Sequence, residues 1–135
     1  MVKKISLALI YIFWLACIPA CQKAPINGDL DGRWQIMEIE KNGETFEVKE
    51  SQLYYNFSLH VCMLTYYGGQ FTDGNMKYDG QTITMDFPYV KTTGQYAILK
   101  QYGIYSNPVT FTVEFHGKDR MTLYNSDSTI SLRKF

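Results

Sequence analysis

The sequence contains little cysteine, little histidine and no excess of charge of either sign. It has 13 basic and 13 acidic side chains, three cysteines and two histidines among 135 residues. Nucleic acids attract proteins through clustered basic side chains, and no such cluster follows the N-terminal segment. We therefore expect no nucleic-acid partner.

Motifs for metal binding and catalysis are also missing. No His-x-x-x-His, Cys-x-x-Cys, Gly-x-Ser-x-Gly or phosphate-loop pattern is present. His60 and His116 fall on the polar faces of expected strands and are interpreted as surface residues. Asp73, Asn75 and Asp79 lack the spacing and the final glutamate of a calcium loop, so two hairpin turns explain them. We predict no enzyme, metal or cofactor, although an active site assembled from distant strands would leave no such motif.

The N-terminus has the layout of an export signal. Two lysines precede residues 5–19, which carry no charge, and Pro19 interrupts this apolar run. A membrane-spanning helix needs about 20 apolar residues, which is more than this run supplies. A short basic segment followed by a short apolar one is typical of a secretory signal peptide, which we place at residues 1–20.

The end of this segment resembles the lipobox of bacterial lipoproteins. In that signal an aliphatic residue and two small ones precede a cysteine that is diacylated and becomes the new N-terminus, and residues 18–21 read Ile-Pro-Ala-Cys. The resemblance implies that Cys21 carries palmitate-type chains, since stable anchoring needs at least two. Residues 14–17, ending in Cys17, form a competing site, and an ordinary signal peptide is the other alternative. On the lipoprotein interpretation Cys62 alone remains free, no intramolecular disulfide forms, and the domain lies in the bacterial envelope, with the outer membrane as the expected location.

Removal of residues 1–20 would leave one domain of 115 residues. Loss of Lys3 and Lys4 would leave 11 basic and 13 acidic side chains. Ten tyrosines, seven phenylalanines and Trp34 remain, and this composition with frequent turns favours an all-β domain. The polar residues 21–30 are predicted to form a flexible tether, and residues 31–135 the domain.

Alternation of apolar and polar residues predicts most of the strands. Residues 53–63 alternate without interruption and predict one long strand. Asn42-Gly43 and Asp79-Gly80 predict tight turns, and residues 92–103 have helical spacing. Together these patterns predict seven or eight antiparallel strands with one short helix, closed into a barrel so that no edge is exposed.

The apolar faces of these strands are the candidate ligand site. Such faces either pack into a solid core or line a cavity for a lipid, pigment or glycan fragment. Tyr96, Tyr102 and Tyr105 on the helix and the loop after it would form a lid over that cavity, or would dock the helix on the sheet. The side chains expected to point inward are Tyr55, Phe57, Leu59, Met63, Tyr78, Met85, Phe87, Phe111, Val113, Phe115, Met121 and Leu123.

Residues at both ends of the domain resemble the lipocalin signature. Gly32-Arg33-Trp34 matches the Gly-x-Trp at the start of the first lipocalin strand, and Arg133 matches the late arginine that stacks over that tryptophan. With its lipoprotein signal, the chain resembles the small lipocalin-like lipoproteins of Bacteroidetes-type bacteria. The resemblance implies an up-and-down barrel that binds a small apolar or amphipathic molecule. The alternative is a non-catalytic accessory lipoprotein with a filled barrel that contacts an envelope protein.

Overall fold

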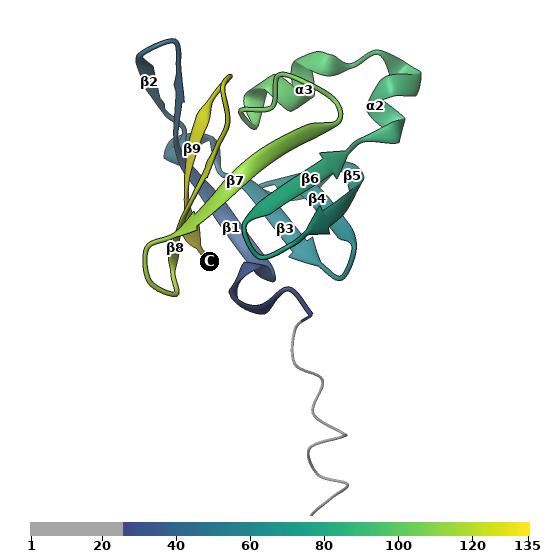
Figure 1. Cartoon of the computed structure of the whole chain (residues 1–135). Coiled ribbons are helices and arrows are strands. Elements are labelled where there is room, and N and C mark those ends of the chain that lie inside the picture. The colour runs from purple at the N-terminus through teal and green to yellow at the C-terminus, as the bar shows by residue number, and fades with distance from the viewer. Residues whose placement is uncertain (1–25) are drawn as a thin grey trace, which may run out of the picture.

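The computed structural model describes residues 26–135, and over this range the chain forms nine strands, two short α-helices and two 3-10 turns (Figure 1). The predicted signal peptide and Cys21 lie outside these residues. In chain order the elements are η1 (Gly28–Leu30), β1 (Gly32–Lys41), β2 (Glu44–Glu47), η2 (Lys49–Ser51), β3 (Leu53–Ser58), β4 (Val61–Tyr66), β5 (Gly69–Tyr78), β6 (Thr82–Asp86), α2 (Pro88–Thr93), α3 (Tyr96–Gln101), β7 (Val109–Phe115), β8 (Arg120–Tyr124) and β9 (Thr129–Lys134).

Eight of the strands close into an antiparallel barrel. Each strand from β3 to β8 pairs with the next one along the chain, and β1 pairs with both β3 and β9. β2 pairs only with the second half of β1, through the predicted Asn42-Gly43 turn, and extends beyond the barrel as a hairpin. The prediction of an all-β, up-and-down antiparallel barrel is confirmed.

The two ends of the barrel carry different elements. The described chain begins at Ile26 at the lower end in Figure 1, which also holds η1 and the C-terminus, and we call this end the base. The helices α2 and α3 lie across the opposite end, which we call the mouth (Figure 1). Leu30 at the end of η1 is fully buried, so the folded part begins before Asp31 and includes part of the expected tether.

The helical region differs from the single helix expected over residues 92–103. Pro88 ends β6 as expected, but it also occupies the first turn of α2, where its missing N–H costs nothing. Gly94 and Gln95 then separate α2 from α3, which begins at Tyr96 and lies within the predicted range.

The long strand predicted over residues 53–63 is wrong, because the chain reverses within it. Leu59 and His60 form a two-residue turn between β3 and β4, which pairs Phe57 with Cys62. Such a turn exchanges the inward and outward positions between the two strands, since side chains alternate along each. Leu59 adopts a φ of 54°, which usually calls for glycine or asparagine. Because neither residue is present, the apolar–polar alternation runs through the turn and hides it in the sequence.

Candidate functional site

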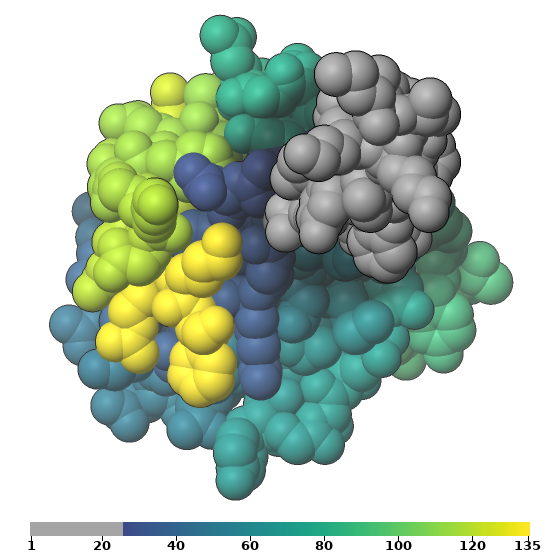
Figure 2. All heavy atoms as spheres, turned by 90° about the horizontal axis from the view of Figure 1, so that it is seen from below, coloured from purple at the N-terminus to yellow at the C-terminus, as the bar shows by residue number. Residues whose placement is uncertain are grey.

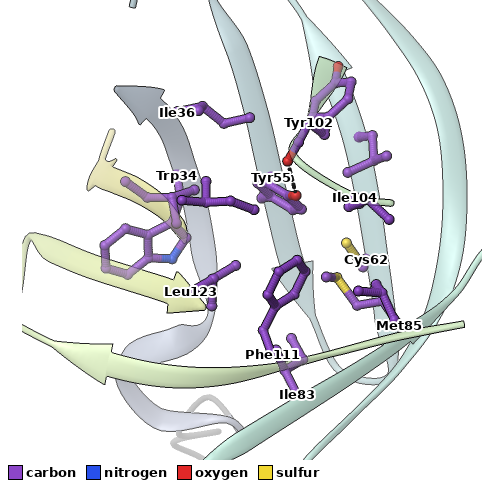
Figure 3. Close-up of a cluster of buried hydrophobic side chains, with 14 of the residues drawn as sticks. Trp34, Ile36, Tyr55, Cys62, Ile83, Met85, Tyr102, Ile104, Phe111 and Leu123 are labelled. Carbon is purple, nitrogen blue, oxygen red and sulfur yellow. Dashed lines mark hydrogen bonds between the residues drawn. The ribbon is translucent and has the colours of Figure 1, made fainter. Parts of the chain in front are cut away.

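The interior of the barrel is filled by the side chains that the sequence analysis proposed as a cavity. Seven of the twelve lie in one buried cluster with Trp34, Cys62 and Tyr102 (Figure 3). The rings of Tyr55 and Phe57 stack with their centroids 5.7 Å apart, and Tyr55 also meets Tyr102 edge-on at 5.8 Å. The seven are Tyr55, Phe57, Met85, Phe87, Phe111, Met121 and Leu123.

The other five proposed residues are placed less deeply. Tyr78, Val113 and Phe115 are half-buried and pack against the cluster from its edge. Leu59 is 59% exposed in the β3–β4 turn, and Met63 is half-buried on the outer face of β4. The predicted inward positions of Leu59 and Met63 are wrong, because the turn places Cys62 and Leu64 inside the barrel instead.

Trp34 closes the base of the barrel. The indole is fully buried, and its Nε1 donates a hydrogen bond to the backbone oxygen of Leu30 over 2.8 Å. Lys134, which pairs with Trp34 across β1 and β9, places its Nζ 5.3 Å from the indole centroid. The ammonium group also donates to the backbone oxygen of Asp29, so the lysine caps the indole and joins it to η1.

The expected stacking of Arg133 on Trp34 is therefore wrong. Arg133 is out of phase with the inward residues of β9, and its Nη2 donates to Gln35 on the outer face over 3.3 Å. Lys134 takes the position over the ring instead. Gly32 leaves room for it, because a Cβ on Gly32 would lie 2.9 Å from the Cε of Lys134.

Tyr102 closes the mouth of the barrel. Its side chain is fully buried, and its hydroxyl donates to the backbone oxygen of Thr65 over 2.6 Å. The hydroxyl of Tyr55, inside the barrel, donates to the backbone oxygen of Tyr102 over 2.5 Å (Figure 3). Ser128, just before β9, donates to the oxygen of Gly103. Residues 102–104 thus form a plug that is bonded to several strands.

Burial keeps the titratable groups in and beneath this plug protonated. It raises the pKa of Tyr55, with smaller contributions from Cys62 and Tyr102. Burial likewise raises the pKa of the Cys62 thiol and of the Tyr102 hydroxyl. A thiol with a raised pKa is a poor nucleophile, so Cys62 acts as a small apolar core residue.

Beside the plug lies a groove of about 460 Å³ that we call the mouth groove. Its apolar lining comes from Val48, Leu53, Tyr66 and Phe71, and Ser51 and Gln101 add polar groups. The rings of Tyr66 and Phe71 lie 4.5 Å apart between centroids, and Phe71 also meets the ring of Tyr102 edge-on at 5.8 Å. This surface fits a small apolar or amphipathic molecule, because it offers aromatic and aliphatic contact with few polar partners.

The sequence analysis did not identify the residues of the mouth groove. Tyr66 and Phe71 face each other because the β4–β5 register shifts between Leu64 and Thr65. The bulge leaves no signal in the alternating pattern, and Val48 reaches the groove only because η2 packs beside β1.

The expected tyrosine lid is divided between two places. Tyr102 belongs to the plug, whereas Tyr96 is 47% exposed and flanks a small depression with Tyr105. The ammonium of Lys41 lies 3.4 Å from the ring centroid of Tyr105 and covers it. These three rings therefore do not act as one group.

The histidines and acidic residues considered in the sequence analysis form no metal centre within residues 26–135. Over that range no group of three His, Cys, Asp or Glu side chains is close enough to hold an ion. His116 instead shares a hydrogen bond of 2.9 Å with Thr122. In the same range no helix has both the length and the apolar character to cross a membrane.

The closed eight-stranded barrel with a groove at its mouth places the chain among the small up-and-down β-barrel proteins. Residues 14–135 match the family model of the lipocalin-like domain, so the chain belongs to this family. No significant match is found among curated proteins.

Two solved structures share the fold. A lipocalin-like protein from Bacteroides uniformis ATCC 8492 has 24% sequence identity and a TM-score of 0.65, and the match covers 80% of this chain and 100% of that one. An uncharacterized protein from Bacteroides eggerthii DSM 20697 has 17% identity and a TM-score of 0.59, with 78% and 98% covered. At these identities the likeness concerns the fold alone.

Proposed function

We propose that this lipocalin-like protein is a non-catalytic envelope lipoprotein that binds a small apolar or amphipathic molecule at the mouth of its barrel. The observation that carries the proposal is the mouth groove, whose volume of about 460 Å³ lies in the usual range of small-molecule sites. Its lining of Val48, Leu53, Tyr66 and Phe71 supplies the contacts that such a ligand needs.

The mouth groove is a better site than the barrel interior. Large side chains fill the interior, and Tyr102 closes it with hydrogen bonds to Tyr55 and Thr65. A ligand inside would have to displace this plug and leave the buried partners of those hydrogen bonds unsatisfied. A ligand in the groove would pack against Phe71 without breaking any of them.

A neutral fluorescent probe tests this site in the full chain. N-phenyl-1-naphthylamine fluoresces when it leaves water, so a titration gives its affinity for the groove. Tyr66→Asp should weaken binding at least about tenfold, because the new carboxylate must be desolvated against the probe. Tyr124→Asp is the matched control, since Tyr124 also ends a strand and is 39% exposed against 38% for Tyr66. Equal affinities in the two variants would reject the mouth groove.

The lipid anchor at Cys21 is the second part of the proposal. The described chain begins at the base, opposite the mouth (Figure 1), so an anchor there would leave the mouth groove directed away from the membrane. Cys21→Ser should release the protein into the soluble fraction of its host. Retention in the membrane fraction would contradict lipidation at this residue.

The packed interior also favours a second candidate function, an accessory lipoprotein whose outer surface contacts an envelope protein. Twenty-three buried residues form one cluster, as in a scaffold without an internal site. Native mass spectrometry of protein purified from its host separates the two functions. A co-purified small molecule supports ligand binding, whereas its absence, together with no binding of the neutral probe, supports the accessory function.

A further inference from the structure

A second groove, of about 410 Å³, lies on the outer wall of the barrel, where β3, β1 and β9 run side by side. We call it the wall groove. Lys49 and Glu50 of η2 line one side of it, so η2 separates it from the mouth groove. In the view from the base, the yellow C-terminal residues lie against the dark-blue start of the domain (Figure 2). The wall groove contains Arg33, Lys49 and Arg133 but only one acidic residue, Glu50.

Arg33 is held in place by aromatic rings. Its guanidinium carbon lies 3.8 Å from the centroid of Tyr54 and 5.2 Å from that of Phe135. Tyr54 is only 3% exposed although it is on the outer face of β3, because these two residues cover it. Stacking fixes the plane of a guanidinium without using its N–H donors, and the Nε of Arg33 has no hydrogen-bond partner among residues 26–135.

Arg133 is positioned by a neutral partner. Its Nη2 donates to the Oε1 of Gln35, and the Nε2 of Gln35 donates to the backbone oxygen of Lys49, both over 3.3 Å. Gln35 is only 5% exposed, so its two hydrogen bonds hold Arg133 in a fixed position on the barrel wall. A glutamine oxygen orients the guanidinium but does not neutralise it.

Within residues 26–135, no ion pair involves the cationic side chains of this wall. Arg133 lies directly opposite Arg120 on β8, and like charges in that position repel each other. Across residues 26–135 the ion pair within 4.0 Å is that of Lys91 with Asp86, which involves none of the wall-groove residues. Among the side chains that line the groove, three are cationic and only Glu50 is anionic.

We propose that the wall groove binds a phosphate monoester attached to an apolar or aromatic group. Such an ester carries close to two negative charges at neutral pH, and the three cationic side chains would attract it. Arg33 and Arg133 supply the forked donors that phosphate oxygens prefer, and Lys49 supplies a point charge. The exposed rings of Tyr67 and Phe135 line the groove and would contact the apolar part of the ligand. This site is separate from the mouth groove and does not depend on the proposed function.

Phenyl phosphate is a suitable probe, titrated by calorimetry into the full chain in non-ionic detergent. Arg133→Gln should weaken its binding at least about tenfold, since a hydrogen bond between charged groups is lost. Arg33→Lys keeps the charge but loses the fork and should also weaken binding severalfold. Arg120→Gln is the matched control, because Arg120 faces Arg133 from β8 but does not line the groove, and it should change affinity less than about twofold.

The same titration identifies the source of the phosphate group. If the groove holds lipid headgroups, adding phosphatidic acid, whose headgroup is a phosphate monoester, to the micelles lowers the apparent affinity for phenyl phosphate, and adding phosphatidylcholine does not. If it holds a soluble ester, both lipids leave the affinity unchanged. Absence of phenyl phosphate binding, or equal losses in Arg133→Gln and Arg120→Gln with unchanged thermal stability, would overturn the proposal.

Discussion

The base and the mouth of the barrel are closed by different kinds of interaction. At the base, Trp34 fills the opening and bonds to Leu30, only four residues earlier in the chain. At the mouth, Tyr55 and Ser128 donate hydrogen bonds to the plug and Thr65 accepts one from it, and these residues are 47, 25 and 37 residues away from their partners. The base therefore combines a local hydrogen bond at an apolar centre with the cap by Lys134, whose bond to Asp29 spans 105 residues, whereas each of these mouth bonds spans at least 25 residues.

This difference also determines how each end resists change. A large buried ring contributes through the apolar surface that it removes from water, and its loss leaves a cavity. The plug also buries the ring of Tyr102, and each of its hydrogen bonds adds about 1 kcal/mol net. We therefore expect substitutions at the base to reduce global stability most, and substitutions at the mouth to act more locally.

Trp34→Ala should have the largest effect. The indole is 0% exposed and contacts both Leu30 and Lys134, so its removal would leave a cavity. We expect a loss of about 3–5 kcal/mol in the free energy of unfolding, measured by urea denaturation. Trp34→Phe should lose clearly less, because it retains an aromatic ring. A loss below about 1 kcal/mol for Trp34→Ala would show that the base is not closed by the indole.

Gly103→Ala should have the next largest effect, at the mouth. Gly103 has a φ of 79°, and a Cβ there would lie 2.8 Å from the Cγ1 of Ile130. Backbone strain and steric overlap together should cost about 2–3 kcal/mol. Gly94→Ala is the matched control, since Gly94 has a φ of 71° but no atom within 4 Å of the added Cβ. Equal losses in thermal stability would show that the plug tolerates the contact with Ile130.

Tyr55→Phe should have a smaller effect that is confined to the mouth. The variant keeps the ring but removes the donor to the backbone oxygen of Tyr102, and we expect a loss of about 1–2 kcal/mol. Hydrogen exchange should accelerate in residues 96–104 more than in residues 30–34. Uniform acceleration over both segments would contradict a local function for this hydrogen bond.

Alkaline pH provides a control for the same hydroxyl. Burial raises the pKa of Tyr55 above its ordinary value of 10.0, so the folded state keeps the proton where the unfolded state loses it. The stability contributed by neutral Tyr55 is complete below about pH 10 and declines as pH rises above this value. Tyr55→Phe should therefore lose less stability than the wild type between pH 9 and about pH 11.

The sequence predicted the start of the barrel at the base better than the mouth, because residues 30–34 form one short segment of the chain. The Gly-x-Trp pattern and the alternating strands indicated a barrel that begins near Trp34. The cap on Trp34 was assigned to Arg133 instead of Lys134, because the family pattern gives a residue type but not the phase of β9. The plug, the mouth groove and the wall groove all depend on strand register, which no single segment encodes.

The missed turn at Leu59 shows the same limit at the base. Asn27 donates to the backbone oxygen of Leu59 over 2.8 Å, so a contact with the N-terminal segment helps to hold the turn that the residue itself disfavours. Leu59 is exposed and has a φ of 54°, a conformation that leucine adopts only at a cost.

Leu59→Gly should consequently stabilise the protein, by about 0.5–1 kcal/mol, the smallest effect in this series. Glycine removes the strain, and little apolar burial is lost because Leu59 is 59% exposed. His60→Gly is the control in the same turn, since His60 is not at a positive φ and should lose about 0.5–1 kcal/mol instead. Opposite signs for these neighbours in thermal unfolding would show that the turn is imposed by the surrounding structure. If both variants lose stability, the left-handed backbone of Leu59 carries no strain, and the turn is intrinsic to its own residues.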